Sequence, residues 1–269
     1  MVKTISTYKE NTRVKFKLKD LIIACLNGLE LFLKDLKENR PESLKIIIED
    51  LTTQYGKNED FRILIPIELN ILNENPELVK ASINAVLSLV SFKKYSQNSI
   101  NDEIDIDAID LITTFNQFEY LFMISLLKIM SREEAIDYIK RLADDVAHSR
   151  NDPKNYVNNL QELLDRYKTN LERWCAQDIT ADFLNERKLM YKVKKCVWAE
   201  VLKGFDHELS YSMMCYQDFE NTKNQNPNFV LTRTKTIMQG FEYCDFCYHD
   251  TRKESEIVHP SVDIWKKLD

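Results

Sequence analysis

Glycine is scarce in this chain of 269 residues, which holds only Gly28, Gly56, Gly204 and Gly240. Neither the G-x-G-x-x-G nor the G-x-x-x-x-G-K-[ST] phosphate loop can be written with these positions, so glycine-rich nucleotide sites are excluded. Large α/β barrels and turn-dense β-sandwiches are disfavoured, because they need many positions with positive φ. A helix-rich globular protein remains.

An excess of positive charge is also missing. The chain has 37 Lys and Arg against 43 Asp and Glu, which gives a formal net charge of −6. Affinity for nucleic acid comes largely from neutralising phosphates, so no nucleic-acid partner is expected. Apolar residues make up 44% of the chain, enough to build a core and to argue against wholesale disorder.

Long hydrophobic runs are absent as well. The most apolar stretch, Tyr120–Met130, is about half as long as a membrane span and contains Lys128, so no membrane partner is expected. The first twenty residues are basic but lack the apolar segment and small-residue cleavage site of a secretory signal. We therefore expect a cytoplasmic protein with reduced thiols.

The first 150 residues carry mainly helical periodicity. Apolar residues recur at intervals of three and four over residues 16–38, which predicts one amphipathic helix with Cys25 on its buried side. Ser131 and Glu134 form a capping box that opens a helix ending at His148. Further helices are predicted over residues 41–55, 60–73, 76–92 and 115–130, and from residue 152 onward.

Residues 95–110 are polar and acidic without a basic residue, which favours a boundary there. The predicted organisation is a helical region at 1–100, an α+β domain at 110–250 and a tail at 251–269. Three roles are open to the N-terminal region: covering a pocket, binding a partner, or forming a homo-oligomer through its helices.

After residue 187 the period changes to that of β-strands. Alternating or β-branched and aromatic segments predict strands at 191–198, 209–216, 229–236 and 243–248, with a short helix at 199–205 between two of them. The sequence therefore predicts an α+β fold, with a helix-rich N-terminal half followed by a small antiparallel sheet flanked by helices.

Chemistry-bearing residues gather in this last region. Four of the six cysteines fall between residues 196 and 247. Cys244 and Cys247, followed by His249, have the spacing of a zinc knuckle, but a closed zinc site needs further ligands and no second pair exists. A redox pair is disfavoured, because alternation within a strand puts the two thiols on opposite faces. No metal and no cofactor are assigned.

Five blocks occur in order in this region: Lys195-Cys-Val-Trp-Ala-Glu-Val-Leu-Lys-Gly204, Met214-Cys-Tyr-Gln-Asp-Phe219, Asn226-Pro, Leu231-Thr-Arg-Thr-Lys-Thr-Ile-Met-Gln-Gly240 and Cys244-Asp-Phe246. In this order and spacing they resemble the L-2-amino-thiazoline-4-carboxylic acid hydrolase family, with the region from about 115 to 250 compatible with it. Cys247 departs from the family pattern, which usually has a basic residue there. Residues 1–100 have no counterpart in the resemblance.

The resemblance implies hydrolysis of a small cyclic amidine that carries a carboxylate. Water adds to the amidine carbon and the ring C–S bond breaks, giving a carbamoyl-cysteine type product. Such a reaction needs a cation for the substrate, a base for the water and stabilisation of the departing thiolate. Arg233 is suited to bind the carboxylate, and Thr236 and Asp245 are assigned to substrate binding with it.

The catalytic candidates are two carboxylates and three thiols, and the resemblance favours Cys215, Asp218 and Cys244 among them. Asp218 or Glu200 is suited to be the base, and a thiolate of Cys215 or Cys196 is an alternative nucleophile. Cys244 lies in the last of the matching blocks. We favour Cys215 with Asp218, which are expected on a strand end and the turn that follows.

Each candidate also has a structural interpretation. Cys196 is equally consistent with a buried structural thiol, and Asp218 with a helix cap for residues 219–224. Glu200 is consistent with a solvated charge, and Arg233 with an exposed strand residue. His259 lies in a predicted loop and is given no chemistry. Two alternative functions follow: a non-catalytic small-ligand sensor on the same scaffold, and a Cys/His metal-binding protein.

Overall fold

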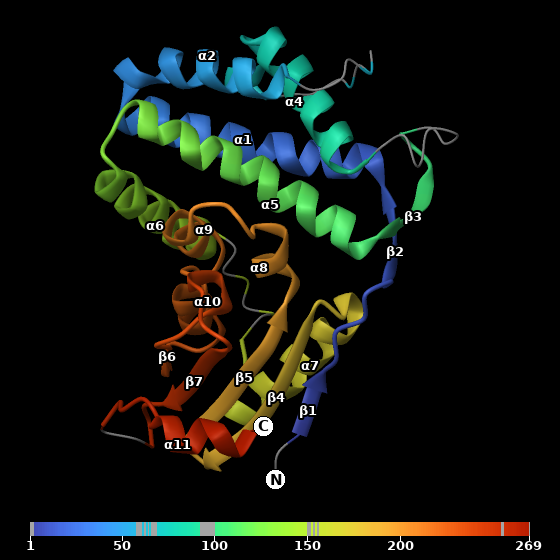
Figure 1. Cartoon of the computed structure of the whole chain (residues 1–269). Coiled ribbons are helices and arrows are strands. Elements are labelled where there is room, and N and C mark those ends of the chain that lie inside the picture. Colours follow the sequence, from blue (N-terminus) through green and yellow to red (C-terminus); the bar gives the residue numbers. More distant parts are fainter. Residues whose placement is uncertain are drawn as a thin grey trace. The chain divides into compact units, whose positions relative to one another are not determined.

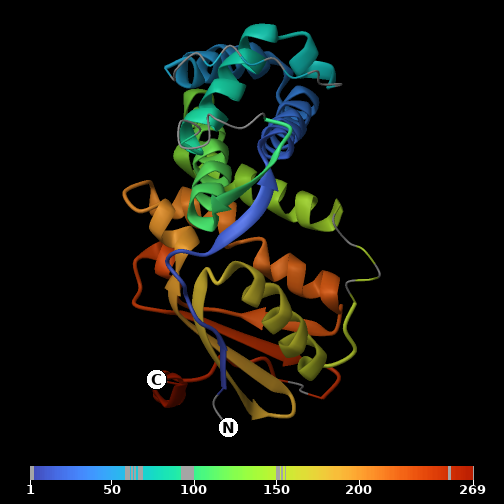
Figure 2. The same cartoon turned by 90° about the vertical axis from the view of Figure 1, so that its right-hand side faces the viewer.

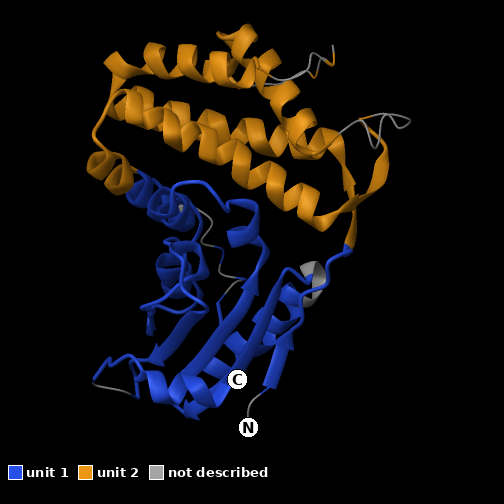
Figure 3. Ribbon diagram, viewed as in Figure 1, with its two compact units in different colours: residues 1–12, 139–269 blue, residues 13–138 orange. Residues whose placement is uncertain are grey.

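The computed structural model describes residues 3–57, 61, 63, 65, 69–91, 100–149, 152, 154, 156–253 and 256–268. The chain divides into two compact units (Figure 3). Unit 1 is discontinuous and contains residues 1–12 and 139–269, whereas unit 2 is the intervening segment 13–138. Helices dominate the N-terminal half and an antiparallel sheet lies in the C-terminal region, so the predicted α+β class is confirmed.

Unit 2 is built on helices. Its helices are α1 (Leu18–Asn39), α2 (Leu44–Tyr55), α3 (Asn70–Asn73), α4 (Pro76–Leu89) and α5 (Ala108–Ser125), with 3-10 turns η1 (Pro41–Ser43) and η3 (Leu126–Lys128). β2 (Arg13–Lys17) and β3 (Glu103–Asp107) form an antiparallel two-stranded ribbon. The sequence did not predict either strand, because the paired residues lie 86 to 94 positions apart, from Lys17 and Glu103 to Arg13 and Asp107.

Helix α1 confirms the amphipathic stripe predicted from residues 16–38. Leu21, Leu29 and Leu33 are fully buried, and a buried leucine contributes about 2 kcal/mol of stability relative to an exposed one. Glu30 lies on the same stripe and is buried too. Its carboxylate accepts hydrogen bonds from the backbone N–H groups at the start of α3. These bonds compensate the buried charge and give partners to N–H groups that have none within the helix.

Helix α6 (Arg132–Ser149) contains the boundary between the two units. Its start confirms the capping box: the Glu134 amide donates to Ser131 Oγ, and the Glu134 carboxylate accepts the Ser131 amide.

Unit 1 holds a five-stranded antiparallel sheet in the order β1-β4-β5-β7-β6. The strands are β1 (Lys3–Ser6), β4 (Gln177–Asn185), β5 (Lys188–Cys196), β6 (Phe229–Thr232) and β7 (Cys244–Asp250). In Figure 1 the blue β1 lies beside the yellow β4, so the first strand of the chain forms one edge of the sheet. β1 and β4 were missed by sequence analysis, because neither carries a strong alternating pattern.

Different helices cover the two faces of this sheet (Figure 2). The unit contains α7 (Leu160–Trp174), α8 (Val197–Val201), α9 (His207–Met214), α10 (Asp218–Gln225), η5 (Ile237–Gln239), α11 (Val262–Trp265) and η6 (Lys266–Leu268). One face packs against α7 through Tyr191, Val193 and Tyr248, and we call it the α7 face. The other packs Met190 and Cys247 against Trp265, and we call it the α11 face.

The predicted strand at 209–216 is wrong, because the segment is helix α9. Asp206 caps this helix, and its carboxylate accepts the backbone N–H groups of Glu208 and Leu209. This cap at the helix start outweighs the β-propensity of the aromatic and apolar residues that follow. The other predicted strands are present with shifted ends, and the predicted strand at 229–236 stops at Thr232.

The helical predictions differ from the structure at several ends. Of the helix predicted at 60–73, the described part is helical only in α3, while residues 60, 62, 64 and 66–68 lie outside the described residues. The predicted boundary at 95–110 contains β3 and the start of α5, with residues 95–99 outside the described residues. The helix expected from residue 152 begins at Leu160, where Asn159 supplies the cap.

Candidate functional site

The centre of the candidate site is a buried guanidinium. Arg233 follows β6 directly, and its side chain is only 1% exposed. Its Nη1 donates to Asp218 Oδ2 at 2.7 Å, and its Nη2 donates to the carbonyl oxygen of Cys215 at 2.9 Å. A buried charge needs such partners, because an unpaired one is strongly destabilising.

Three aromatic rings surround this guanidinium. Its central carbon lies 4.7 Å from the ring centroid of Phe246, 5.0 Å from that of Phe219 and 5.4 Å from that of Tyr211. The ring quadrupoles attract the cation, while the rings keep water away from the guanidinium. Phe219 and Phe246 stand in the sequence blocks named above, but Tyr211 was missed because its segment was predicted to be a strand.

The loop between α9 and α10 presents the acidic partner. Cys215 is the C-cap residue of α9, and Asp218 is the first residue of α10. The expected positions, a strand end and the following turn, are therefore wrong. Asp218 is inside the helix rather than its N-cap, which is Gln217, so the capping interpretation of this carboxylate does not hold.

Three thiols lie within electrostatic reach of the ion pair. Cys215 interacts with both Asp218 and Arg233 and with the thiols of Cys196 and Cys244. Burial raises the pKa of the Cys244 thiol to about 12, and it raises the pKa of Cys215 well above its ordinary value. These two thiols are therefore protonated at neutral pH and are poor nucleophiles until a base removes the proton.

Asp218 combines a raised pKa with access to solvent. Burial of the carboxylate raises its pKa, and the Arg233 guanidinium offsets only part of that shift. The side chain is nevertheless 36% exposed, so water can reach it. A carboxylate of this kind is a stronger base than an ordinary surface aspartate and can exchange protons with a bound molecule.

Two of the candidates lie apart from this group. Glu200 on α8 is exposed, and its carboxylate is 3.9 Å from the Lys195 ammonium. Thr236 is buried and caps η5, where its hydroxyl oxygen accepts the Gln239 amide. The structure thus brings five candidates within electrostatic range of one another: Cys196, Cys215, Cys244, Asp218 and Arg233.

Asp245 points to the opposite side of the sheet, the α11 face. Its Oδ1 accepts the backbone N–H groups of Thr234 and Lys235, at 2.8 and 2.7 Å. Its Oδ2 accepts the Thr234 hydroxyl and lies 3.0 Å from Nε2 of His259. Burial favours the neutral acid, but the hydrogen bonds from His259, Thr234 and Lys235 outweigh it and hold the pKa of Asp245 below its usual value.

A chain of polar contacts continues from Asp245 across this face. Nδ1 of His259 is 2.9 Å from the Thr232 hydroxyl, which is also 2.9 Å from Nε2 of His249. The imidazole of His259 stacks on Trp265. His259 therefore takes part in a buried polar network, although its sequence context predicts no chemistry for it. Its partners are distant in sequence, so no local pattern could have revealed the network.

The thiols of the C-x-x-C segment do not converge. Cys244 belongs to the core on the α7 face, whereas Cys247 packs with Trp265 on the α11 face. All six cysteines are free thiols. Across the described residues, no group of three or more His, Cys, Asp or Glu side chains has an arrangement that could hold a metal ion. The same residues include no helix with the length and hydropathy of a membrane span.

Comparison with known proteins gives one result that bears on this site. Residues 115–248 match the family model described as L-2-amino-thiazoline-4-carboxylic acid hydrolase. Neither the curated proteins nor the solved structures give a match. The matched segment contains all five residues of the group around Arg233, and it supports a hydrolase. The C-terminal region of this chain, over residues 115–248, belongs to the L-2-amino-thiazoline-4-carboxylic acid hydrolase family.

Proposed function

We propose that this protein hydrolyses a small cyclic amidine of the 2-amino-thiazoline-4-carboxylate type, cleaving its C–S bond. The observation that carries the proposal is the Arg233–Asp218 ion pair, set among three thiols and enclosed by aromatic rings within the family-matched segment. A partly exposed carboxylate of raised pKa beside this enclosure supplies the proton transfers that such a hydrolysis requires.

Asp218 acts as the base for an attacking water molecule. Water adds across the C=N bond of the amidine, with its hydroxyl going to carbon and its proton passing through Asp218 to the ring nitrogen. The C–S bond then breaks, and the proton of the new hydroxyl passes to the departing sulfur. The product is a carbamoyl-cysteine type molecule with a free thiol. No other reactant is needed.

Arg233 positions Asp218 in this proposal. Its side chain is 1% exposed and is bonded to Asp218 and to the Cys215 carbonyl, so a substrate carboxylate would have to displace an internal partner to reach it. The role expected from the sequence, binding of the substrate carboxylate, therefore fits this geometry less well. The guanidinium fixes the orientation of the base and limits the rise of its pKa.

Cys215 is the alternative nucleophile. Its thiol is protonated at neutral pH, because burial and the neighbouring Asp218 raise its pKa. Attack by sulfur would therefore also need Asp218 as the base, and the resulting thiouronium would then have to be hydrolysed. Direct attack by water uses the same base in fewer steps, so we favour it.

The experiment is thiol release from 2-amino-thiazoline-4-carboxylate, measured for the full chain and for Asp218→Asn and Cys215→Ala. Turnover by the wild type, with loss in Asp218→Asn and retention in Cys215→Ala, supports direct attack by water. Loss in both variants supports the thiol route. Absence of turnover by the folded wild type, with the six protein thiols subtracted as background, overturns the substrate assignment.

A further inference from the structure

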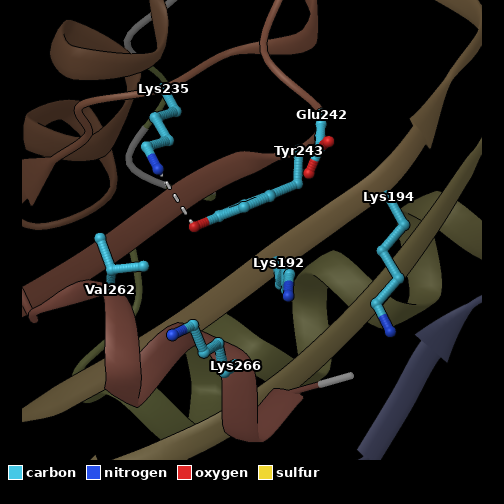
Figure 4. Close-up of a pocket in the computed structure, with 7 residues that line it drawn as sticks. All are labelled: Lys192, Lys194, Lys235, Glu242, Tyr243, Val262 and Lys266. Carbon is cyan, nitrogen blue, oxygen red and sulfur yellow. Dashed lines mark hydrogen bonds between the residues drawn. The ribbon is translucent and has the colours of Figure 1, made fainter.

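The α11 face carries a cavity that the proposed hydrolase chemistry does not use. Its volume is about 460 Å³. Seven side chains line it (Figure 4): Lys192, Lys194, Lys235, Glu242, Tyr243, Val262 and Lys266. We call this the lysine pocket. Cavities that bind small ligands begin at about 300 Å³, so this one has room for a metabolite-sized molecule.

Three separate elements bring the lysines together. Lys192 and Lys194 alternate with Val193 on β5, and this places them on the α11 face. Lys235 lies between β6 and η5, where Asp245 fixes its backbone N–H. Lys266 begins η6 near the end of the chain. Because their ammonium groups repel one another, their convergence costs free energy unless an anion compensates it.

Tyr243 is the centre of the pocket. The Lys192 ammonium lies 4.5 Å from its ring centroid and the Lys235 ammonium lies 5.1 Å from it. In Figure 4 the ring lies between these two side chains, and a hydrogen bond joins Lys235 Nζ to the phenol oxygen. Lys192 is buried, and its Nζ donates to the Trp265 carbonyl oxygen at 3.2 Å. The two cations are thus held in place before any ligand arrives.

Positive charge exceeds negative charge among the described residues that line the pocket. Glu242 is the single carboxylate among the described lining residues, which together carry a formal net charge of plus three. Two more carboxylates lie close by. Asp263 is 2.9 Å from the Lys266 ammonium, and Asp245 is engaged by Thr234, Lys235 and His259. Positive side chains therefore outnumber negative ones among the described residues in and beside the pocket.

We propose that the lysine pocket binds a small phosphate-bearing anion with at least two negative charges. Lysine ammonium groups are compact point charges that suit the several oxygens of a phosphate, and four of them line the pocket. The Tyr243 ring and Val262 add a small apolar wall for the organic part of the ligand. This site lies on the opposite face from Asp218 and does not depend on the hydrolase proposal.

Isothermal titration of the full chain with inorganic pyrophosphate, at constant ionic strength, tests this inference. The variants are Lys235→Gln and Lys266→Gln, and the matched control is Lys267→Gln, an exposed neighbour of Lys266 outside the lining. Each removal of a lining ammonium is expected to weaken binding by about tenfold, the usual size of a charge-assisted contact. The control is expected to bind as the wild type does, and the thermal unfolding of all variants verifies their fold.

Three outcomes overturn the inference. The first is no binding of pyrophosphate by the folded wild type at millimolar concentration. The second is an equal loss in Lys266→Gln and Lys267→Gln, which would mean unspecific screening of surface charge. The third is equal or tighter binding of citrate, which would assign the pocket to polycarboxylates. Binding of glycerol phosphate as well as pyrophosphate supports an organic phosphate ligand, whereas binding of pyrophosphate alone supports an inorganic one.

Discussion

Two aspartates in unit 1 respond to burial in opposite ways. Asp218 has one charged partner, Arg233, and burial leaves its pKa raised. Asp245 accepts hydrogen bonds from two backbone amides and a hydroxyl and contacts His259, which together hold its pKa below the usual value. The number of donors decides the result, so the first carboxylate can exchange protons while the second is fixed in its charged form.

The alternation of side chains along a strand separates these two environments. Cys244 faces α7 and its neighbour Asp245 faces α11. Likewise, Thr232 contacts His259 on the α11 face, while the next residue, Arg233, reaches the rings of Phe219 and Phe246. Residues adjacent in sequence, within β7 or at the end of β6, therefore serve a reactive region and a structural one, and closeness in sequence does not mean a shared site.

Substitution of Asp218, the aspartate that can exchange protons, should have the largest effect on kcat. Asp218→Asn keeps the size of the side chain but removes the base, so kcat for thiol release should fall by about 10²–10⁴, the usual contribution of general base catalysis. Glu200→Gln, which changes an exposed carboxylate beside Lys195, should leave kcat within about twofold. An equal fall in both variants would remove the distinction between these carboxylates. Circular dichroism must show that both variants are folded.

The next largest effect is expected in the alkylation rates of the buried thiols around Arg233. The pKa of Cys244, about 12 against an ordinary 9.0, leaves about 10³-fold less thiolate below pH 9 than a free thiol has. Iodoacetamide at pH 8 should therefore label Cys244 and Cys215 far more slowly than it labels N-acetylcysteine, as measured by peptide mass spectrometry. In urea all six cysteines should react alike. Rapid labelling of Cys215 in the folded protein would favour a thiolate nucleophile over Asp218 acting on water.

The structural aspartate should affect stability and leave catalysis intact. Asp245→Asn replaces an acceptor of several hydrogen bonds by an amide, so the free energy of unfolding should fall by about 2–3 kcal/mol. Asp263→Asn, at an exposed ion pair, should change it by less than about 0.5 kcal/mol. Urea titrations measure both. Loss of kcat in folded Asp245→Asn would place this carboxylate in the reaction. It would contradict the assignment of proton exchange to Asp218 and of a structural role to Asp245.

Asp245 and Asp218 should also affect the pH dependence of the free energy of unfolding in opposite directions. These effects should be smaller than the ones above. The folded-state pKa of Asp245 lies below its unfolded value, so its stabilisation is complete above about pH 5 and is lost as the pH falls through the folded pKa. The stability difference between the wild type and Asp245→Asn should therefore shrink on acidification. Asp218 has a raised folded pKa, so acidification should instead favour the wild type over Asp218→Asn. Urea titrations at several pH values between 7 and 3 measure both trends, and equal slopes would contradict them.

Local signals in the sequence predicted the local structure well. The stripe of α1, the capping box at Ser131 and the alternation around Cys244 depend on residues that are near one another in the chain. The edge strand β1 has no strong alternating pattern of its own, and its partner β4 lies far away in sequence, so no local signal predicts it. At 209–216 the aromatic and apolar composition predicted a strand, but the cap at Asp206 stabilises a helix.

The sequence predicts which residues form the candidate site better than it predicts how they are arranged in space. The sequence blocks identified Cys215, Asp218 and Arg233, and the structure joins them through one guanidinium. Asp245 was grouped with them although strand alternation puts it on the other face. Lys235 and Lys266 reach the lysine pocket from loops and turns distant in sequence, so no pattern of spacing predicts their convergence.

The pairing of β1 with β4 has a consequence for synthesis on the ribosome. Lys3 pairs with Ala181, which is translated 178 residues later. At about 5–20 residues per second, β1 waits roughly ten to forty seconds for its partner. Unit 2, a continuous segment between them, leaves the ribosome during that interval. A truncation that begins at residue 13 keeps all of unit 2 but removes β1, and it leaves β4 as an unprotected sheet edge of the kind that promotes aggregation.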